Sequence, residues 1–533
     1  MARVTSQAPP VPLRTRLVAA LDRYAGWPLT LAVTALAAAV RLPALDRPYP
    51  LVFDETYYVK DGWTLATLGY EASWPDEPNP AFEAGFTDSH LGTAAFVVHP
   101  PVGKWIIGMG MRLLGGDDRV GWRIGVALAG IVTVLLVVRA ARRLLRSTVL
   151  GGVAGTLVAL DGTAIVESRI AILDGILALF VVAAFAALLV DRDRTAARMR
   201  PLTAADDVGG RGADATAPEE PPPEPAAPEG LGPSLGLRPW RLVAGVMLGL
   251  ALGTKWSALY FVAAFGLLSF GWDLALRRRT GTRRWWLAAL VHDAVPAFGS
   301  LVVLAGVVYT ATWASWFASP DSYGRRWAEA LPGGNAVSDA IGSWWHFHDQ
   351  IWNFHTNLEA THPYAAHPLG WIVQWRPTSF YYQSPEPADA MCGAERCAQA
   401  VTSLGNPFVW WFAVAALLAA LVVVLRRRDL TPVALLVGVA AGWLPWFLHA
   451  DRPIFAFYAV VFLPFLAMLV AWAVGRLWRW SHDDAFWRRV VVLGYAVGAV
   501  LVVGAAVFFY PVWTGQVITL DAWQLRQWLR SWV

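Results

Sequence analysis

The chain has 533 residues, of which 56% are hydrophobic and only 15% are charged, and it carries 30 tryptophans. This composition excludes an ordinary soluble domain and indicates a polytopic membrane protein. The net charge of +4 is uninformative, and because arginines beside apolar segments are what membrane orientation requires, we expect no nucleic-acid partner.

Eleven apolar segments are each long enough to cross a hydrocarbon core about 30 Å thick as a helix. They lie at residues 26–44, 121–138, 148–165, 170–190, 240–254, 256–275, 287–312, 406–425, 430–448, 453–474 and 490–511. If each segment crosses once, all the arginine-rich connections fall on one side, which is therefore predicted to be cytoplasmic. The sequence thus predicts an all-α polytopic membrane protein with two long extracytoplasmic loops.

The N-terminal arm, residues 1–25, is basic and is predicted to be cytoplasmic. Arg41 ends the first apolar segment where small residues would precede a cleavage site, so this segment is interpreted as a retained helix. The first four helices occupy 26–190 and include an extracytoplasmic loop at 45–120. In this loop an amphipathic helix is expected after Asp54, and "GKWIIGMGMRLLG" predicts a re-entrant or interfacial helix because it is too short to span.

The remaining boundaries follow from composition. Residues 191–239 are rich in Pro, Ala, Gly and charge and predict a disordered cytoplasmic loop, in which "DRD" is interpreted as a solvated helix flank. The rest of the chain divides into helices five to seven (240–313), a large extracytoplasmic loop (314–405), the last four helices (406–511) and an extracytoplasmic tail (512–533).

The large loop at 314–405 is rich in tryptophan and histidine. Six tryptophans between Trp313 and Trp352 suggest helices that lie at the headgroup level. The chain's two cysteines, Cys392 and Cys397, fall on the outer side, where a local disulfide is favoured over a metal site, although spacing alone does not fix the pairing.

Polar residues that are unusual for a membrane protein gather at outer helix ends and outer loops. They are Asp54, Glu55, His99, Lys104, Arg123, Glu167, Arg169, Lys255, Asp451 and Arg452. Charge near the apolar region is costly, so these positions indicate a functional site by default. The alternative for any single residue is that its charge snorkels to water.

Such a face suits a particular substrate chemistry. Lysine and arginine bind phosphate or pyrophosphate, and a carboxylate can act as general base for a hydroxyl nucleophile. A lipid-linked phosphosugar needs both and arrives in the membrane plane.

Five blocks of sequence resemble the actinobacterial protein O-mannosyltransferases. They are "FDETYYVKDGW", "HPPVGKW", "ESRIAILDGILALF", "GTKWSALY" and "HFHDQIWNFHTNLEATHPYAAHPLGWIVQWRP". The resemblance implies an eleven-helix GT-C fold, a polyprenyl-phosphate mannose donor, and inverting transfer to Ser or Thr of a polypeptide emerging across the plasma membrane. The secretion channel is a candidate partner that would deliver this acceptor.

The resemblance also implies roles for single residues. Asp54 corresponds to the catalytic base, and Glu55 beside it would position substrate or helix, because neighbouring residues of a helix point in different directions. The donor's phosphate and sugar would be bound by residues drawn from His99, Lys104, Arg123, Arg169, Asp174, Lys255 and Arg452. His355, His362 and Trp375 would form a wall of the loop that faces the acceptor or the lipid phosphate.

Three alternatives remain open. His346 and His348 are interpreted as interfacial polar groups of a helix. No carboxylate or cysteine lies at a spacing that would complete a metal site with them, so no metal site or other cofactor is predicted, while a divalent-metal requirement stays open.

A GT-C relative could move another lipid-linked sugar onto a lipid or polysaccharide, which the His/Trp-rich block disfavours. A transporter would place polar groups near the midplane, whereas here they gather outside.

Overall fold

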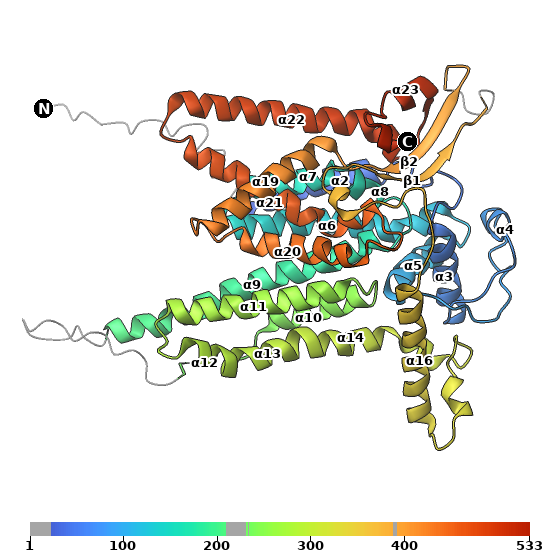
Figure 1. Cartoon of the computed structure of the whole chain (residues 1–533), viewed down its shortest axis with the longest axis horizontal. Coiled ribbons are helices and arrows are strands. Elements are labelled where there is room, and N and C mark those ends of the chain that lie inside the picture. Colours follow the sequence, from blue (N-terminus) through green and yellow to red (C-terminus); the bar gives the residue numbers. More distant parts are fainter. Residues whose placement is uncertain (1–22, 209–230, 233, 387–391) are drawn as a thin grey trace, which may run out of the picture.

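The computed structural model describes residues 23–208, 231–232, 234–386 and 392–533. Most of the predicted N-terminal arm and the middle of the predicted loop at 191–239 therefore lie outside the described residues. The described chain is mostly helical, and its helices pack into one elongated bundle (Figure 1).

The described residues contain six helical segments that are long and apolar enough to cross a membrane. They are α6 (Arg119–Leu145), α9 (Asp174–Val208), α11 (Ala258–Arg279), the continuous segment Trp285–Thr312, α19 (Pro407–Leu425) and α22 (Ala485–Trp513). The segment Trp285–Thr312 consists of α12 (Trp285–Ala289), α13 (Val295–Phe298) and α14 (Leu304–Thr312), joined by two π-helical turns.

Shorter helices complete the bundle. They are α2 (Trp27–Arg41), α7 (Thr148–Ala159), α8 (Gly162–Val166), α10 (Pro239–Leu252), α20 (Val433–Trp443) and α21 (Leu463–Trp480). Each of the eleven predicted segments thus contains a helix, whereas the crossing of all eleven stays a prediction.

Both long loops gather at the same end of the bundle, which we call the outer end. Figure 1 shows α3, α4, α5, α16 and the strands at this end, and the C-terminal part of α9 at the opposite end. The loop helices are α3 (Glu55–Leu68), α4 (Asn79–Glu83), α5 (Val102–Leu114), α15 (Ala314–Ala318), α16 (Ala336–Thr356) and α17 (Pro368–Trp371). The helices expected after Asp54 and at "GKWIIGMGMRLLG" are both present, as α3 and α5.

Helices α3 and α5 approach so closely that glycine is required where they meet. A Cβ atom on Gly108 would lie 2.2 Å from the carbonyl oxygen of Gly62, and one on Gly62 would lie 2.8 Å from that of Lys104. Because α3 begins directly after Asp54, this contact fixes the position of the carboxylate.

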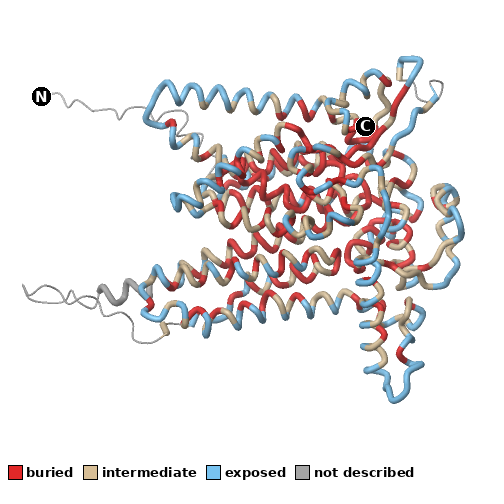
Figure 2. The backbone as a smooth tube through the Cα atoms, in the orientation of Figure 1, coloured by how far each residue is buried: buried red, intermediate tan, exposed pale blue. Residues whose placement is uncertain are grey.

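Burial divides the bundle into a core and a lipid-facing surface. Figure 2 shows buried residues along the central helices and exposed ones along α22. Beyond Arg488 and Arg489 near its start, the exposed side chains of α22 are mainly apolar, among them Leu493, Val500 and Val507, as expected for a helix that faces hydrocarbon.

A small antiparallel sheet, absent from the sequence-based prediction, lies at the outer end. Its strand order is β1 (Thr378–Gln383), β2 (Cys397–Ser403), β3 (Val517–Thr519). The predicted C-terminal tail supplies β3 and α23 (Leu520–Gln524), so the end of the chain is tied to the large loop. Cys392 and Cys397 form a disulfide beside the start of β2, the local pairing that the sequence favours.

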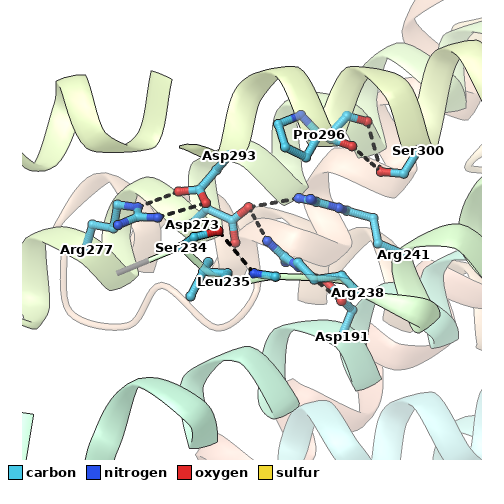
Figure 3. Close-up of polar contacts among 12 residues, drawn as sticks. Asp191, Ser234, Leu235, Arg238, Arg241, Asp273, Arg277, Asp293, Pro296 and Ser300 are labelled. Atoms are coloured by element: carbon cyan, nitrogen blue, oxygen red, sulfur yellow. Dashed lines mark hydrogen bonds and ion pairs between the residues drawn. The ribbon is translucent and has the colours of Figure 1, made fainter. Parts of the chain in front are cut away.

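At the opposite end, the first part of the predicted disordered loop is ordered, which corrects its boundary at residue 191. Helix α9 continues to Val208, and Asp191 of "DRD" is buried rather than solvated because it pairs with Arg238. Figure 3 shows how this pair extends: Arg238 and Arg241 share Asp273 at 2.6 and 3.2 Å, and Arg277 pairs with Asp293. Each of the three buried carboxylates thus has an arginine partner, as a low-dielectric environment requires.

Candidate active site

The carboxylate of Asp54 lies at the start of α3 without capping the helix. Asp54 occupies the N-cap position, but its side chain accepts no hydrogen bond from a backbone amide of α3, unlike most aspartates there. The Tyr58 hydroxyl donates to its Oδ2 at 3.4 Å. Burial raises the pKa of Asp54 to about 6, although the nearby charge of Lys255 opposes this rise. Asp54 is therefore a base poised close to neutral pH.

Residue Phe53 holds this carboxylate in place at some backbone cost. Its φ of 50° lies in the left-handed region, which a residue with a bulky side chain rarely adopts. Its ring contacts those of Phe380 (4.9 Å), Phe455 (5.8 Å) and Phe457 (5.8 Å), and this aromatic packing offsets the strain. His362 also contacts Phe53, at 5.9 Å between ring centroids.

A buried ion pair faces Asp54 from two other helix ends. The Nζ of Lys255, between α10 and α11, lies 3.0 and 2.9 Å from the two carboxylate oxygens of Asp174, the first residue of α9. The same Nζ lies 4.2 Å from the ring centroid of Tyr458, a cation–π contact. Burial alone would lower the pKa of Lys255, but the charge of Asp174 outweighs it, so the lysine stays cationic.

Glu167 is a third carboxyl group in this cluster. It is fully buried just after α8, its Oε1 accepts from the Ser403 hydroxyl at 3.4 Å, and its Oε2 has no partner. Burial, reinforced by the charge of Asp174, raises the pKa of Glu167 well above its ordinary value. Burial therefore favours the protonated, neutral form of Glu167.

Two neutral histidines, His99 and His355, lie beside each other in this cluster. The rings of His99 and His355 lie 5.4 Å apart, and His99 lies 6.0 Å from Tyr58. The Nε2–H of His355 donates to the Val98 carbonyl at 3.0 Å. Burial lowers the pKa of His99 well below its ordinary value and that of His355 to about 4. Neither ring is a cation at pH 7.

Arg452 has hydrogen-bond donors that its protein partners do not use. Its Nη1 donates to the main-chain carbonyl of His355 at 2.9 Å, while its buried Nε has no partner. Its positive charge acts on His99 and Tyr458, in each case in the direction that lowers the pKa. The structure therefore brings together Asp54, Asp174, Lys255, His99, His355 and Arg452, as predicted, along with Glu167.

Four other predicted residues have structural roles instead. Glu55 and Arg123 are fully buried and form a two-pronged pair, with Nε–Oε1 and Nη2–Oε2 distances of 2.8 Å. The remaining donors of Arg123 go to carbonyls of residues 45, 48 and 50. Glu55 also accepts from the Ala171 amide at 2.7 Å. Glu55 is therefore placed to position the start of α3, one of the two roles expected of it, whereas the donors of Arg123 are all used within the protein, which does not fit the predicted phosphate contact.

Lys104 and Arg169 are engaged in the same way. Lys104 pairs with Glu71 and lies 4.0 Å from Asp61. Arg169 donates to the carbonyls of Arg41, Pro43 and Ala44, and so fastens the loop after α2. Both predicted phosphate ligands are thus used to hold loops, because buried cations must be partnered.

The other predicted residues lie at the margin. Trp375 is 60% exposed and its carbonyl accepts from Ser531, and Asp451 is exposed in a turn. No group of three or more His, Cys, Asp or Glu side chains that could hold a metal ion occurs in the part of the chain that the structure describes.

Sequence reasoning missed Tyr58, Ser403 and Tyr458. Tyr58 follows Asp54 by four residues, and this helical spacing could have identified it. Ser403 and Tyr458 reach the site from β2 and from the 3-10 helix Ala456–Val461, and no local signal marks either one.

Comparison with known proteins gives consistent matches. The family model described as "Dolichyl-phosphate-mannose-protein mannosyltransferase" matches residues 31–203, and that described as "C-terminal four TMM region of protein-O-mannosyltransferase" matches residues 340–532. Relatives named "Polyprenol-phosphate-mannose--protein mannosyltransferase" are 37% identical in Mycobacterium tuberculosis, over 99% of this chain and 96% of theirs, and 34% identical in Corynebacterium glutamicum, over 90% and 88%.

A solved structure shares the fold. It is the S. cerevisiae protein O-mannosyltransferase Pmt1-Pmt2 complex bound to the sugar donor, with a TM-score of 0.68 over 98% of this chain and 93% of that one. Its sequence identity of 14% limits the comparison to architecture.

Proposed function

The chain belongs to the protein O-mannosyltransferase family, and from this premise we propose that it transfers mannose from a polyprenyl-phosphate donor to Ser or Thr hydroxyls of an acceptor polypeptide. The observation that carries the proposal is the unpaired Asp54 carboxylate beside the Lys255–Asp174 pair, with Arg452 close by. A base and phosphate-binding cations at one helix-bundle end are what this reaction needs.

Among the three clustered carboxyl groups, Asp54 alone suits the role of base. Asp174 is held by Lys255, and burial favours the protonated form of Glu167, which cannot accept a proton. Asp54 has a raised pKa and only a long hydrogen bond from Tyr58. It takes the proton of the acceptor hydroxyl as the hydroxyl oxygen attacks the anomeric carbon.

Lys255 and Arg452 bind the donor phosphate. As the new C–O bond forms, the bond from the anomeric carbon to the phosphate oxygen breaks, and its electron pair leaves with the polyprenyl phosphate. The two cations stabilise this developing charge. With a single free carboxylate there is no second nucleophile, so one displacement inverts the anomeric configuration.

The reaction takes place at the extracytoplasmic face of the plasma membrane. The site lies at the outer end, opposite the arginine-rich connections that mark the cytoplasmic side. A membrane-borne donor reaches this end laterally, and the acceptor arrives as it leaves the secretion channel.

The test supplies purified protein with radiolabelled polyprenyl-phosphate mannose and a Thr-rich peptide. Label on the peptide, lost when its threonines are replaced by valine, is the expected result. Label only in a lipid or polysaccharide product would assign the chain to a different transfer reaction, and no consumption of the donor would refute the proposal.

A further inference from the structure

The β1 strand leaves one edge of the outer sheet unpaired. The strand order β1-β2-β3 makes β1 an edge strand, and the other edge, β3, has only three residues. The sequence of β1, "TSFYYQ", contains neither charge nor proline, two of the features with which natural proteins protect an exposed edge, and its one register irregularity, between Ser379 and Tyr381, comes before Tyr382. Figure 2 shows the outer part of the β1–β2 hairpin exposed.

The register shows which backbone groups face this open edge. The Leu520 amide donates to the Arg396 carbonyl on the β3 side, so alternate residues of β2 from Arg396 face β3. Gln399 and Val401 therefore face β1, and they pair with Gln383 and Tyr381. It follows that the N–H and C=O of Tyr382, which lies between them, point away from the sheet.

This open position is accessible and close to Asp54. Tyr382 is 45% exposed. Two residues earlier, about 7 Å along the strand, Phe380 contacts the ring of Phe53 at 4.9 Å, directly beside Asp54. A chain paired with Tyr382 would therefore lie near the Phe53–Asp54 segment.

We propose that the acceptor polypeptide binds as an additional β-strand on the open edge of β1, through the backbone N–H and C=O of Tyr382. This inference rests on the proposed function, because it names how the acceptor of that reaction is held. Main-chain pairing gives affinity with little demand on sequence, and extends the acceptor so that a Ser or Thr side chain can face Asp54.

The first test is a series of Thr-containing peptides, each carrying one N-methyl group at a successive backbone position. In strand pairing only alternate residues donate to the edge. Every second N-methyl group is therefore expected to raise the peptide KM about tenfold, the effect of losing one hydrogen bond and adding a clash. N-methylation at the intervening positions should leave KM within about twofold.

The second test changes the edge itself. Tyr382→Pro removes the outward N–H while leaving the ladder bonds of Tyr381 and Gln383, and Tyr382→Ala is its matched control because it removes the same side chain but keeps the N–H. The proline variant is expected to raise the peptide KM about tenfold over the alanine variant, with the donor KM and the melting temperature equal in both.

The outcomes separate the two proposals. Failure to mannosylate the unmethylated peptide would overturn the proposed function and the edge binding with it. Transfer to that peptide with no alternation along the series, or equal peptide KM values for the proline and alanine variants, would overturn the edge binding alone. Disulfide-linked dimers of Tyr382→Cys would assign the edge to a second copy of the chain instead.

Discussion

Asp54 and Glu55 are adjacent in sequence yet differ in every contact that decides their chemistry. The Glu55 carboxylate accepts hydrogen bonds from Arg123 and the Ala171 amide, whereas the Asp54 carboxylate accepts only a long hydrogen bond from Tyr58. The sequence predicted which charges gather at the outer end. It could not predict that Arg123 donates hydrogen bonds to carbonyls of the loop after α2, because these partners are distant from Arg123 in the sequence and no local pattern indicates them.

If Asp54 is the base, as we propose, its pKa sets the pH dependence of transfer. A base works only when ionised, and a pKa raised to about 6 means that Asp54 becomes protonated as pH falls through 6. We expect kcat/KM to be level near pH 7.5 and to fall about tenfold per unit below pH 6. Initial rates across pH, with donor binding measured in parallel, check this. A level profile down to pH 4.5 would contradict it.

Arg123 and Arg452 were both predicted to bind the donor, but their substitutions should affect different measurements. Arg123→Gln leaves Glu55 buried without its counter-charge and should cost about 3–5 kcal/mol of stability, measured by thermal unfolding in detergent. Arg452→Gln should instead raise the donor KM about ten- to a hundredfold, the loss of a charged hydrogen bond, with little change in melting temperature. The reverse pattern would exchange their roles.

At the scale of elements, the helices followed from periodicity and length, but the sheet did not. The strands β1 and β2 sit in a loop whose tryptophans and histidines suggested interfacial helices, and β3 pairs with β2 from more than a hundred residues away. Such pairing has no local signal. The helix after Asp54 was predicted, while its close contact with α5 depends on Gly62 and Gly108, which the sequence did not single out.

That contact gives a prediction about α3 as a unit. Gly108→Ala places a methyl group 2.2 Å from the Gly62 carbonyl, so α3 must move. We expect a loss of about 1–3 kcal/mol in stability together with a lower kcat, because Asp54 moves with α3. The control is Gly494→Ala on α22, where a Cβ meets nothing within 4 Å. Equal effects of the two variants on melting temperature would contradict this account.

For the whole molecule, membership of the family and the GT-C fold, both predicted from sequence blocks, are confirmed by the relatives and by the shared architecture. The two long loops meet at one end because an even number of helices separates them. The sequence could not place the buried ion network around Asp273, which joins α9, α10 and α11 at the opposite end (Figure 3), since the loop there was interpreted as disordered.

Sidedness is a prediction at this scale. Single cysteines replacing Tyr57, in α3, or Thr361, in the large loop after α16, are exposed and should react in intact cells with a membrane-impermeant maleimide. A cysteine replacing Arg428, between α19 and α20, should react only after the membrane is opened. The native cysteines are joined in a disulfide and give no background. Labelling of position 428 alone in intact cells would invert the topology.

The role of Asp54 as the base can be tested by the rate of mannose transfer with Asp54→Asn in a single turnover. Asparagine keeps the shape of the side chain but cannot accept the proton. The account predicts a loss of roughly 10²- to 10⁴-fold in rate, with donor affinity and melting temperature close to those of the wild type. Transfer at the wild-type rate would contradict it.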